Sequence, residues 1–70
     1  MQMKITLFLS KHAKKRMAEK AINKEQIIQA IQRGSKFRQT EGLLVVYRDI
    51  EVAYRVLGNN AYKIKTVKIR

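Results

Sequence analysis

The hydrophobic period of the sequence changes from helical to extended at Gly34, and this change limits the folds open to the chain. Over residues 11–33, apolar residues recur at the three- to four-residue spacing of amphipathic helices. After it, short segments rich in Val, Ile, Tyr and Thr are separated by turn-forming residues, which is the pattern of antiparallel strands. Helices and strands that occupy separate parts of a chain indicate an α+β fold.

Two short helices are predicted before Gly34. Ser10 stands where its side chain can accept a hydrogen bond from the first helical turn, which predicts an N-cap for a helix over residues 11–20. Asn23 and Gln26 form a capping-box pattern for a second helix, and Gly34 provides its C-terminal end. Because few residues separate the two segments, we expect a helical hairpin, preceded by a strand over residues 3–9.

Four further strands are predicted after Gly34, over residues 37–40, 43–48, 52–57 and 61–69. Their short connections favour an antiparallel meander. In the last segment Tyr62 and Ile64 share one phase of alternation while Val67 and Ile69 take the other, which predicts a bulge near Lys65 or Thr66. We therefore expect one domain over residues 1–70, in which the helical hairpin covers one face of a twisted, mostly antiparallel sheet and leaves the other face open.

Charge is the property that most narrows the function. The 70 residues carry sixteen Lys and Arg against five Asp and Glu, a net charge of +11, and the basic residues are spread along the chain. A folded domain with such an excess binds polyanions, of which nucleic acid is the first candidate and an acidic protein another. The absence of cysteine excludes a disulfide framework and a thiolate metal site.

The apolar run near the N-terminus is too short for a membrane span, and no signal-peptide pattern follows it. We therefore expect a cytoplasmic protein that does not bind a membrane. A chain of this length buries only about 60% of its unfolded surface, so a partner subunit would add stability. A homodimer is therefore one of the alternatives.

Basic and aromatic side chains of the predicted sheet are the candidate nucleic-acid contacts, because an open sheet face can present them to phosphates and bases. Each Tyr, taken singly, is more often a half-buried core residue, and lysines of a last strand often protect a sheet edge. The prediction therefore depends on the set as a whole. Its basic members in the sheet are Arg48, Lys63, Lys65, Lys68 and Arg70, and Lys15 of the first predicted helix is added to them.

His12 and Arg16 are the candidate catalytic pair, one helical turn apart beside an apolar stripe of Ala13 and Met17. One His and five scattered carboxylates do not form a metal-ligand set, so the reaction considered is RNA cleavage without metal or cofactor. His12 would move the proton, and Arg16 or Arg55 would stabilise the phosphate. The alternative is a His12 at a helix cap or core edge without a catalytic role.

The segment Ser10-Lys-His-Ala-Lys-Lys-Arg-Met17 resembles the S-x-H-A-x-x-R-M opening of a small prokaryotic family of unknown function, related to RelE/ParE/BrnT-like toxins. Tyr54-Arg55-Val56 and the strand that follows are similar to the C-terminal hairpin of RelE/ParE-type toxins. This resemblance implies a toxin-like fold and a ribonuclease acting on messenger RNA, with Tyr54 and Arg55 in the site and Arg70 as the terminal basic residue. It also implies neutralisation by an acidic antitoxin-like protein.

Three hypotheses therefore stay open. The leading one is a toxin-like RNA-binding protein that acts as a metal-independent ribonuclease of a toxin–antitoxin pair. The alternatives are a non-catalytic nucleic-acid-binding module, which acts through counterion release, and a basic protein-interaction domain. A DNA-reading helix-turn-helix is disfavoured, because the sheet predicted after the helices is too large for a wing alone.

Overall fold

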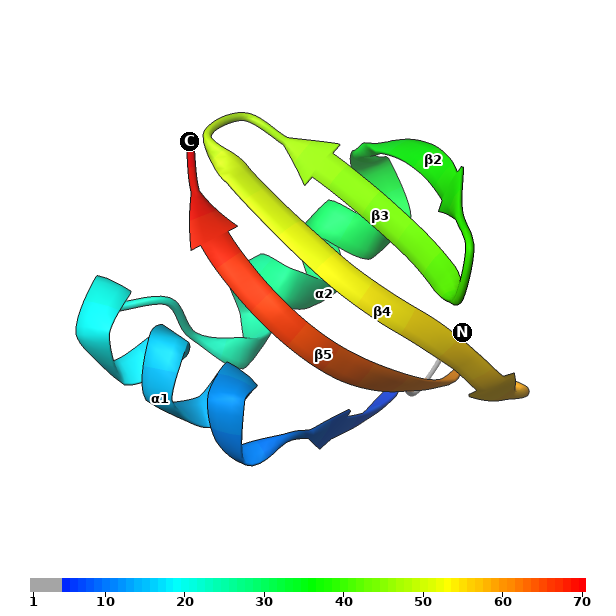
Figure 1. Cartoon of the computed structure of the whole chain (residues 1–70), viewed down its shortest axis with the longest axis horizontal. Coiled ribbons are helices and arrows are strands. Elements are labelled where there is room, and N and C mark those ends of the chain that lie inside the picture. The colour runs from blue at the N-terminus through cyan, green and yellow to red at the C-terminus, as the bar shows by residue number, and fades with distance from the viewer. Residues whose placement is uncertain (1–4) are drawn as a thin grey trace.

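The computed structural model describes residues 5–70, which form a mixed sheet of five strands with two helices packed on one of its faces (Figure 1). The strand predicted over residues 3–9 is present as β1 but starts at Thr6, with Ile5 before it. Met3 and Lys4 of the predicted segment lie outside the described residues. In chain order the elements are β1 (Thr6–Leu9), α1 (Lys11–Lys20), α2 (Lys24–Arg33), β2 (Ser35–Gln39), β3 (Gly42–Tyr47), β4 (Ile50–Gly58) and β5 (Ala61–Ile69).

The helices begin at the capping residues that the sequence predicts. Ser10 Oγ accepts a hydrogen bond from Ala13 N at 3.0 Å, which fixes the first turn of α1. Asn23 and Gln26 form a reciprocal capping box, in which each side chain accepts a hydrogen bond from the other residue's backbone N–H. α2 ends at Gly34, as predicted. These local hydrogen bonds satisfy N–H groups that a helix start would otherwise leave unpaired.

The strands are arranged in the order β1-β5-β4-β3-β2. The meander from β2 to β5 is antiparallel throughout, as predicted. β1 pairs with β5 in parallel, and the sequence did not predict this pairing. The last strand in sequence therefore lies inside the sheet, between β1 and β4. In Figure 1, α2 lies behind the sheet, α1 lies beside β5, and the front face carries no helix.

Several predicted strand boundaries shift at the turns. β2 starts at Ser35 rather than at residue 37, and Thr40 belongs to the turn. Arg48, predicted as the end of a strand, occupies the β3–β4 turn with a φ of 57°. β4 is longer at both ends than the predicted segment 52–57, because pairing with β3 and β5 continues up to the turns.

The β5 bulge forms where the alternation of apolar residues predicts it. Ala53 pairs with Thr66 and Tyr54 pairs with Ile64, so Lys65 is the extra residue of β5. This shift turns both Ile64 and Val67 toward the helices, and both are fully buried. Ser10 Oγ donates a hydrogen bond of 2.9 Å to the carbonyl oxygen of Lys65, which ties the start of α1 to the bulge.

The core lies between the helices and the covered face of the sheet. None of the polar or charged side chains described between residues 5 and 70 is buried in it. Neither helix in this part of the chain is long and apolar enough to cross a membrane. The core consists of Ala13, Met17, Ile22, Ile27, Ala30, Ile31, Val45, Ile50, Val52, Tyr54, Ile64 and Val67.

Candidate nucleic-acid interface

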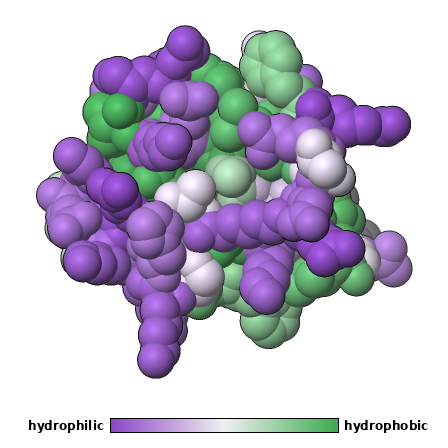
Figure 2. Space-filling model, viewed as in Figure 1, coloured by the Kyte–Doolittle hydropathy of each residue, from purple (hydrophilic) through white to green (hydrophobic). Residues whose placement is uncertain are grey.

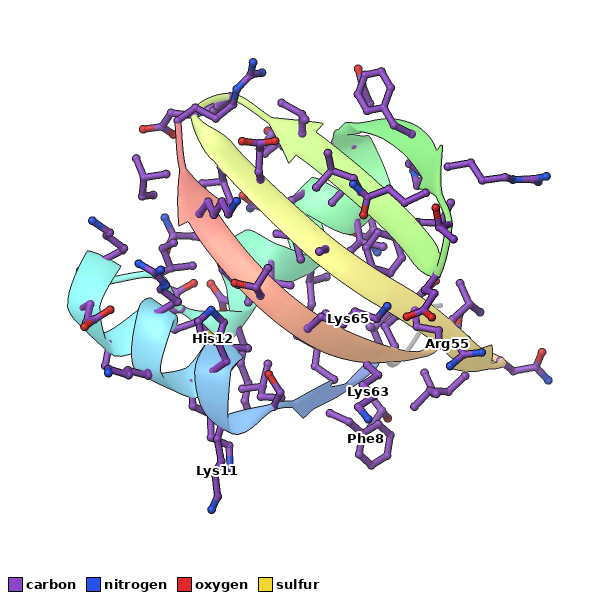
Figure 3. The ribbon with its side chains drawn as sticks, viewed as in Figure 1. Phe8, Lys11, His12, Arg55, Lys63 and Lys65 are labelled. Carbon is purple, nitrogen blue, oxygen red and sulfur yellow. The ribbon has the colours of Figure 1, made fainter. Side chains whose placement is uncertain are left out.

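Phe8, Lys63 and Arg55 form a row across the open face of three neighbouring strands, which we call the aromatic–basic row. Phe8 of β1 pairs with Lys63 of β5, and Lys63 pairs with Arg55 of β4. Their chain neighbours Tyr54 and Ile64 are buried against the helices, so alternation places the row on the opposite face. All three side chains are exposed, Phe8 by 53% (Figure 3).

Lys65 adds a fourth side chain next to this row. It is half buried, and its Nζ donates a hydrogen bond to the carbonyl oxygen of Glu41 in the β2–β3 turn. To reach that turn from β5, the side chain crosses β4 on the open face (Figure 3). The one ion pair among residues 5–70 joins Arg70 Nε to Glu51 Oε2 at 3.8 Å, so no side chain of the row forms an ion pair within the described chain.

His12 and Arg16 lie together on α1, as predicted, but away from the row. With Lys15 and Glu19 they line a shallow hollow of about 170 Å³ on the helix surface. His12 is exposed, and Arg16 is half buried beside the core residues of α1. Figure 3 shows His12 and Arg55 on different sides of the open face. The structure therefore does not bring Arg55 into one site with the His12 pair.

Tyr54 is a core residue, which corrects its predicted place in the site. Its side chain is 1% exposed and packs edge-to-face on Tyr62, with ring centroids 5.6 Å apart and an interplanar angle of 75°. Burial, and to a lesser degree the nearby Tyr62, raises the pKa of the Tyr54 phenol. Tyr54 and Arg55 are adjacent in sequence and therefore face opposite sides of the sheet. The hydroxyl of Tyr54 thus stays neutral and away from the open face.

The other predicted basic contacts lie outside the row. Arg48 is in the β3–β4 turn, with its guanidinium 5.4 Å from the centre of the Tyr47 ring. Lys68 pairs across the sheet with Glu51, the same residue that forms the ion pair with Arg70. At this end of the open face a carboxylate offsets part of the positive charge. None of the ion pairs within residues 5–70 involves the row of Phe8, Lys63 and Arg55.

Phe8 is the site residue that the sequence prediction does not include. Thr6 and Phe8 are exposed, whereas Leu7 and Leu9 are half buried against the core. The alternation of exposed and covered residues therefore continues through Phe8, but the sequence pattern does not show this because Phe8 is apolar. Extending the phase of Thr6 by two residues would have identified Phe8.

Hydrophilic side chains cover much of the open face, and hydrophobic side chains are exposed between them (Figure 2). The most exposed large apolar residues of the described chain are Phe8, Phe37, Val56, Leu57 and Ile69. No group of three or more His, Cys, Asp or Glu side chains within residues 5–70 is arranged to hold a metal ion. The face thus offers positive charge and an aromatic ring as its binding groups.

Comparison with known protein families places the chain in one of them. The model of a domain of unknown function (DUF4258) matches residues 9–68, which include both helices and most of the sheet. No curated protein and no solved structure matches the chain. The match agrees with the expected small family of unknown function, while the relation to RelE/ParE-type toxins stays a prediction.

Proposed function

Because the chain belongs to the DUF4258 family, which is defined as a domain of unknown function, its activity has to be inferred from the site, and we propose that it binds single-stranded RNA. The observation that carries this proposal is the aromatic–basic row, in which an exposed Phe8 lies in register with two cationic side chains. Binding uses the open face formed by β1, β5 and β4, and it needs no metal or cofactor.

The row has the chemistry that single-stranded nucleic acid requires. A base stacks on the Phe8 ring, and adjacent phosphates contact Lys63 and Arg55. Neighbouring strands are about 4.8 Å apart, so the three side chains span about 10 Å of the sheet. A base inside a duplex is already stacked and cannot use such a ring, which favours single strands. The resemblance to toxins that act on messenger RNA favours RNA over DNA.

Two phenylalanine variants test the stacking contact. Phe8→Ala should weaken binding of a fluorescently labelled single-stranded RNA by about 5- to 150-fold, the range that corresponds to one lost base–aromatic stack. Phe37→Ala is the matched control, because Phe37 is equally exposed, at 53%, but lies on β2 at the other edge of the sheet. Fluorescence anisotropy measures both affinities. Equal losses in the two variants would show that Phe8 has no specific role.

The salt dependence of affinity tests the phosphate contacts. Each phosphate contact on a single strand contributes about 0.7 to the slope of log K against log salt concentration. The double variant Arg55→Ala/Lys63→Ala should therefore lower this slope by about 1.4. Lys20→Ala/Lys24→Ala removes the same charge from exposed helix positions and should leave the slope nearly unchanged. If both double variants lower the slope equally, binding is spread over the surface and the row is not the site.

A metal-independent ribonuclease of a toxin–antitoxin pair is the second candidate. The hollow on α1 favours it, because a potential proton donor and acceptor, His12, lies there with the cations Lys15 and Arg16. Incubation of the protein with labelled RNA in EDTA, beside the variant His12→Ala, separates the two candidates. We expect wild type to retard the RNA on a gel and leave it intact. Cleavage by wild type that disappears in His12→Ala would establish the ribonuclease instead.

A further inference from the structure

β2 is an edge strand with a free outer side. It lies at the end of the sheet opposite β1, and all five of its side chains are exposed. Its pairing with β3 starts at a two-residue turn, where Gln39 is opposite Gly42. Hydrogen-bonded and non-hydrogen-bonded pairs alternate along an antiparallel ladder, so the backbone N–H and C=O groups of Lys36 and Arg38 point away from β3. No strand within residues 5–70 pairs with this edge.

The side chains beside these backbone groups are cationic. Lys36 is opposite the buried Val45, and Arg38 is opposite Leu43, so both lie on the helix side of the sheet. β2 itself contains no acidic residue, and the preceding α2 ends in another cation, Arg33. In a second copy paired on this edge, like charges would stand opposite each other and destabilise the strand pair. The edge therefore disfavours its own copy and favours a strand that carries carboxylates.

The open side of β2 carries an apolar anchor. Phe37 is 53% exposed and lies opposite Leu44, which is half buried. A strand added to β2 would place one side chain beside Phe37 on the open face. Its two neighbours in sequence would then lie beside Lys36 and Arg38 on the other face. The complementary three-residue pattern is acidic, apolar, acidic.

The helix side of β2 has room for these acidic side chains. α2 packs against β3 and β4, and beyond it lies a hollow of about 530 Å³. Lys36 lines this hollow together with Gln32, Tyr54 and Tyr62. A carboxylate that pairs with Lys36 would lie at the edge of the hollow, where both partners stay accessible to water.

We propose that the outer edge of β2 binds an extended acidic segment of a partner protein, which joins the sheet as a sixth strand. Backbone hydrogen bonds to Lys36 and Arg38 hold the segment, their charges select its carboxylates, and Phe37 selects an apolar residue between them. In the sheet, β3 lies between this edge and Arg55 of β4, the member of the aromatic–basic row nearest to it. The proposal therefore does not depend on RNA binding.

A synthetic peptide of alternating glutamate and valine tests the location of binding. Added to isotopically labelled protein, it should shift the backbone amide resonances of residues 35–39 more than those of β4 and β5. A peptide of the same composition, with its glutamates and valines in two separate blocks, should bind more weakly because it cannot alternate its faces. Shifts centred on the aromatic–basic row, or no binding at all, would overturn the proposal.

Two variants at one position separate strand addition from simple charge attraction. Lys36→Ala removes the charge and keeps the outward N–H, whereas Lys36→Pro removes both without breaking a bond to β3. Lys36→Pro should therefore bind the alternating peptide about two- to tenfold more weakly than Lys36→Ala, the loss of one backbone hydrogen bond. Equal affinities would contradict strand addition. Circular dichroism of both variants checks that the sheet is retained.

The variants Phe8→Ala and Phe37→Ala also test peptide binding, but here Phe37→Ala is the test and Phe8→Ala is the control. Phe37→Ala should weaken binding of the alternating peptide, and Phe8→Ala should leave it unchanged. Sedimentation of the free protein tests the remaining occupant, a second copy of the chain. A dimer that dissociates when Lys36→Pro is introduced would show that β2 pairs with itself and would replace the proposed acidic partner.

Discussion

Ser10 connects two elements that are far apart in sequence. Its hydroxyl accepts a hydrogen bond from Ala13 N and donates one to the carbonyl oxygen of Lys65, so it fixes both the first turn of α1 and the β5 bulge. Ser10→Ala should lower the free energy of unfolding by about 1–2 kcal/mol, the usual cost of a lost N-cap. Urea denaturation measures this change.

Ser35→Ala is the matched control for that prediction. Ser35 is exposed at the start of β2, where surface substitutions usually change stability by less than about 0.5 kcal/mol. If the two alanine variants are equally stable, the bond from Ser10 to the bulge contributes nothing to the fold.

Tyr54 makes the fold sensitive to alkaline pH. Its pKa in the folded protein is raised by burial, and to a smaller extent by Tyr62. A pKa raised by folding stabilises the protein fully below the unfolded value of about 10, and this contribution is lost as pH rises through the folded value. The free energy of unfolding should therefore fall above about pH 10, and it should fall less in Tyr54→Phe. Urea denaturation across this range measures both; parallel pH profiles would contradict the role of Tyr54.

At the level of single residues, the sequence predicted correctly those roles that depend only on residues nearby in the chain. The caps at Ser10 and Asn23 involve atoms within three residues, and both are present. Alternation divides the residues of β4 into two faces, but it does not say which face the helices cover. The resemblance to RelE/ParE-type toxins assigned Tyr54 and Arg55 to one site, whereas in the structure they face opposite sides of the sheet. Phe8 was missed because an apolar side chain on an open face resembles a core residue.

The end of α2 packs closely against β3 because Gly34 has no side chain. A Cβ there would lie 2.6 Å from both Ala30 O and Val45 Cγ2, and 2.7 Å from Val46 O. Two of these atoms belong to the backbone, so the helix would have to move away from the sheet. Gly34→Ala should therefore lower the free energy of unfolding by about 1–3 kcal/mol.

Gly58→Ala provides the comparison, because no atom lies within 4 Å of a Cβ at that position. This variant should leave stability unchanged or raise it by up to about 1 kcal/mol through the unfolded state. Thermal and urea unfolding of the two variants measure the difference. A Gly34→Ala protein as stable as Gly58→Ala would show that the helix end adjusts freely.

At the level of elements, the sequence predicted both helices, the antiparallel meander and the bulge, because capping residues, short turns and alternation are local signals. The parallel pairing of β1 with β5 has no local signal. It depends on how the helical hairpin returns the chain to the sheet, and the strand order follows from packing of the whole core. The turn boundaries moved for a related reason, since pairing with a neighbour extends β4 beyond its apolar residues.

The charge of the whole molecule should make its stability depend on salt. A net charge of +11 acts on a fold with a radius of gyration of 11.1 Å, and the screening length at 0.1 M salt is about 10 Å. Raising sodium chloride from about 0.02 M to about 0.3 M should therefore weaken the repulsion within the folded state and raise Tm. A gain of about 1 kcal/mol corresponds to about 4–8 °C in a domain of this size.

Circular dichroism melting curves measure this shift, with Lys20→Gln/Lys24→Gln as the comparison. The double variant carries two fewer positive charges on exposed helix positions, so its Tm should rise less with salt. A Tm that falls or stays constant with salt in both proteins would mean that repulsion among the basic residues does not destabilise the folded state. The excess charge is the reason to expect a polyanionic partner, and the fold adds one open sheet face and one free strand edge.

β5 occupies the interior of the sheet, and this position has a consequence for how the protein is made. β1 is synthesised near the start of this sequence, yet its partner strand begins at Ala61. During translation the helices can form early, whereas the sheet remains incomplete until β5 leaves the ribosome. A product cut short before Ala61 leaves β1 without its partner strand and lacks Ile64 and Val67 of the core. Such fragments would be substrates for proteolysis, so only chains that reach β5 would accumulate.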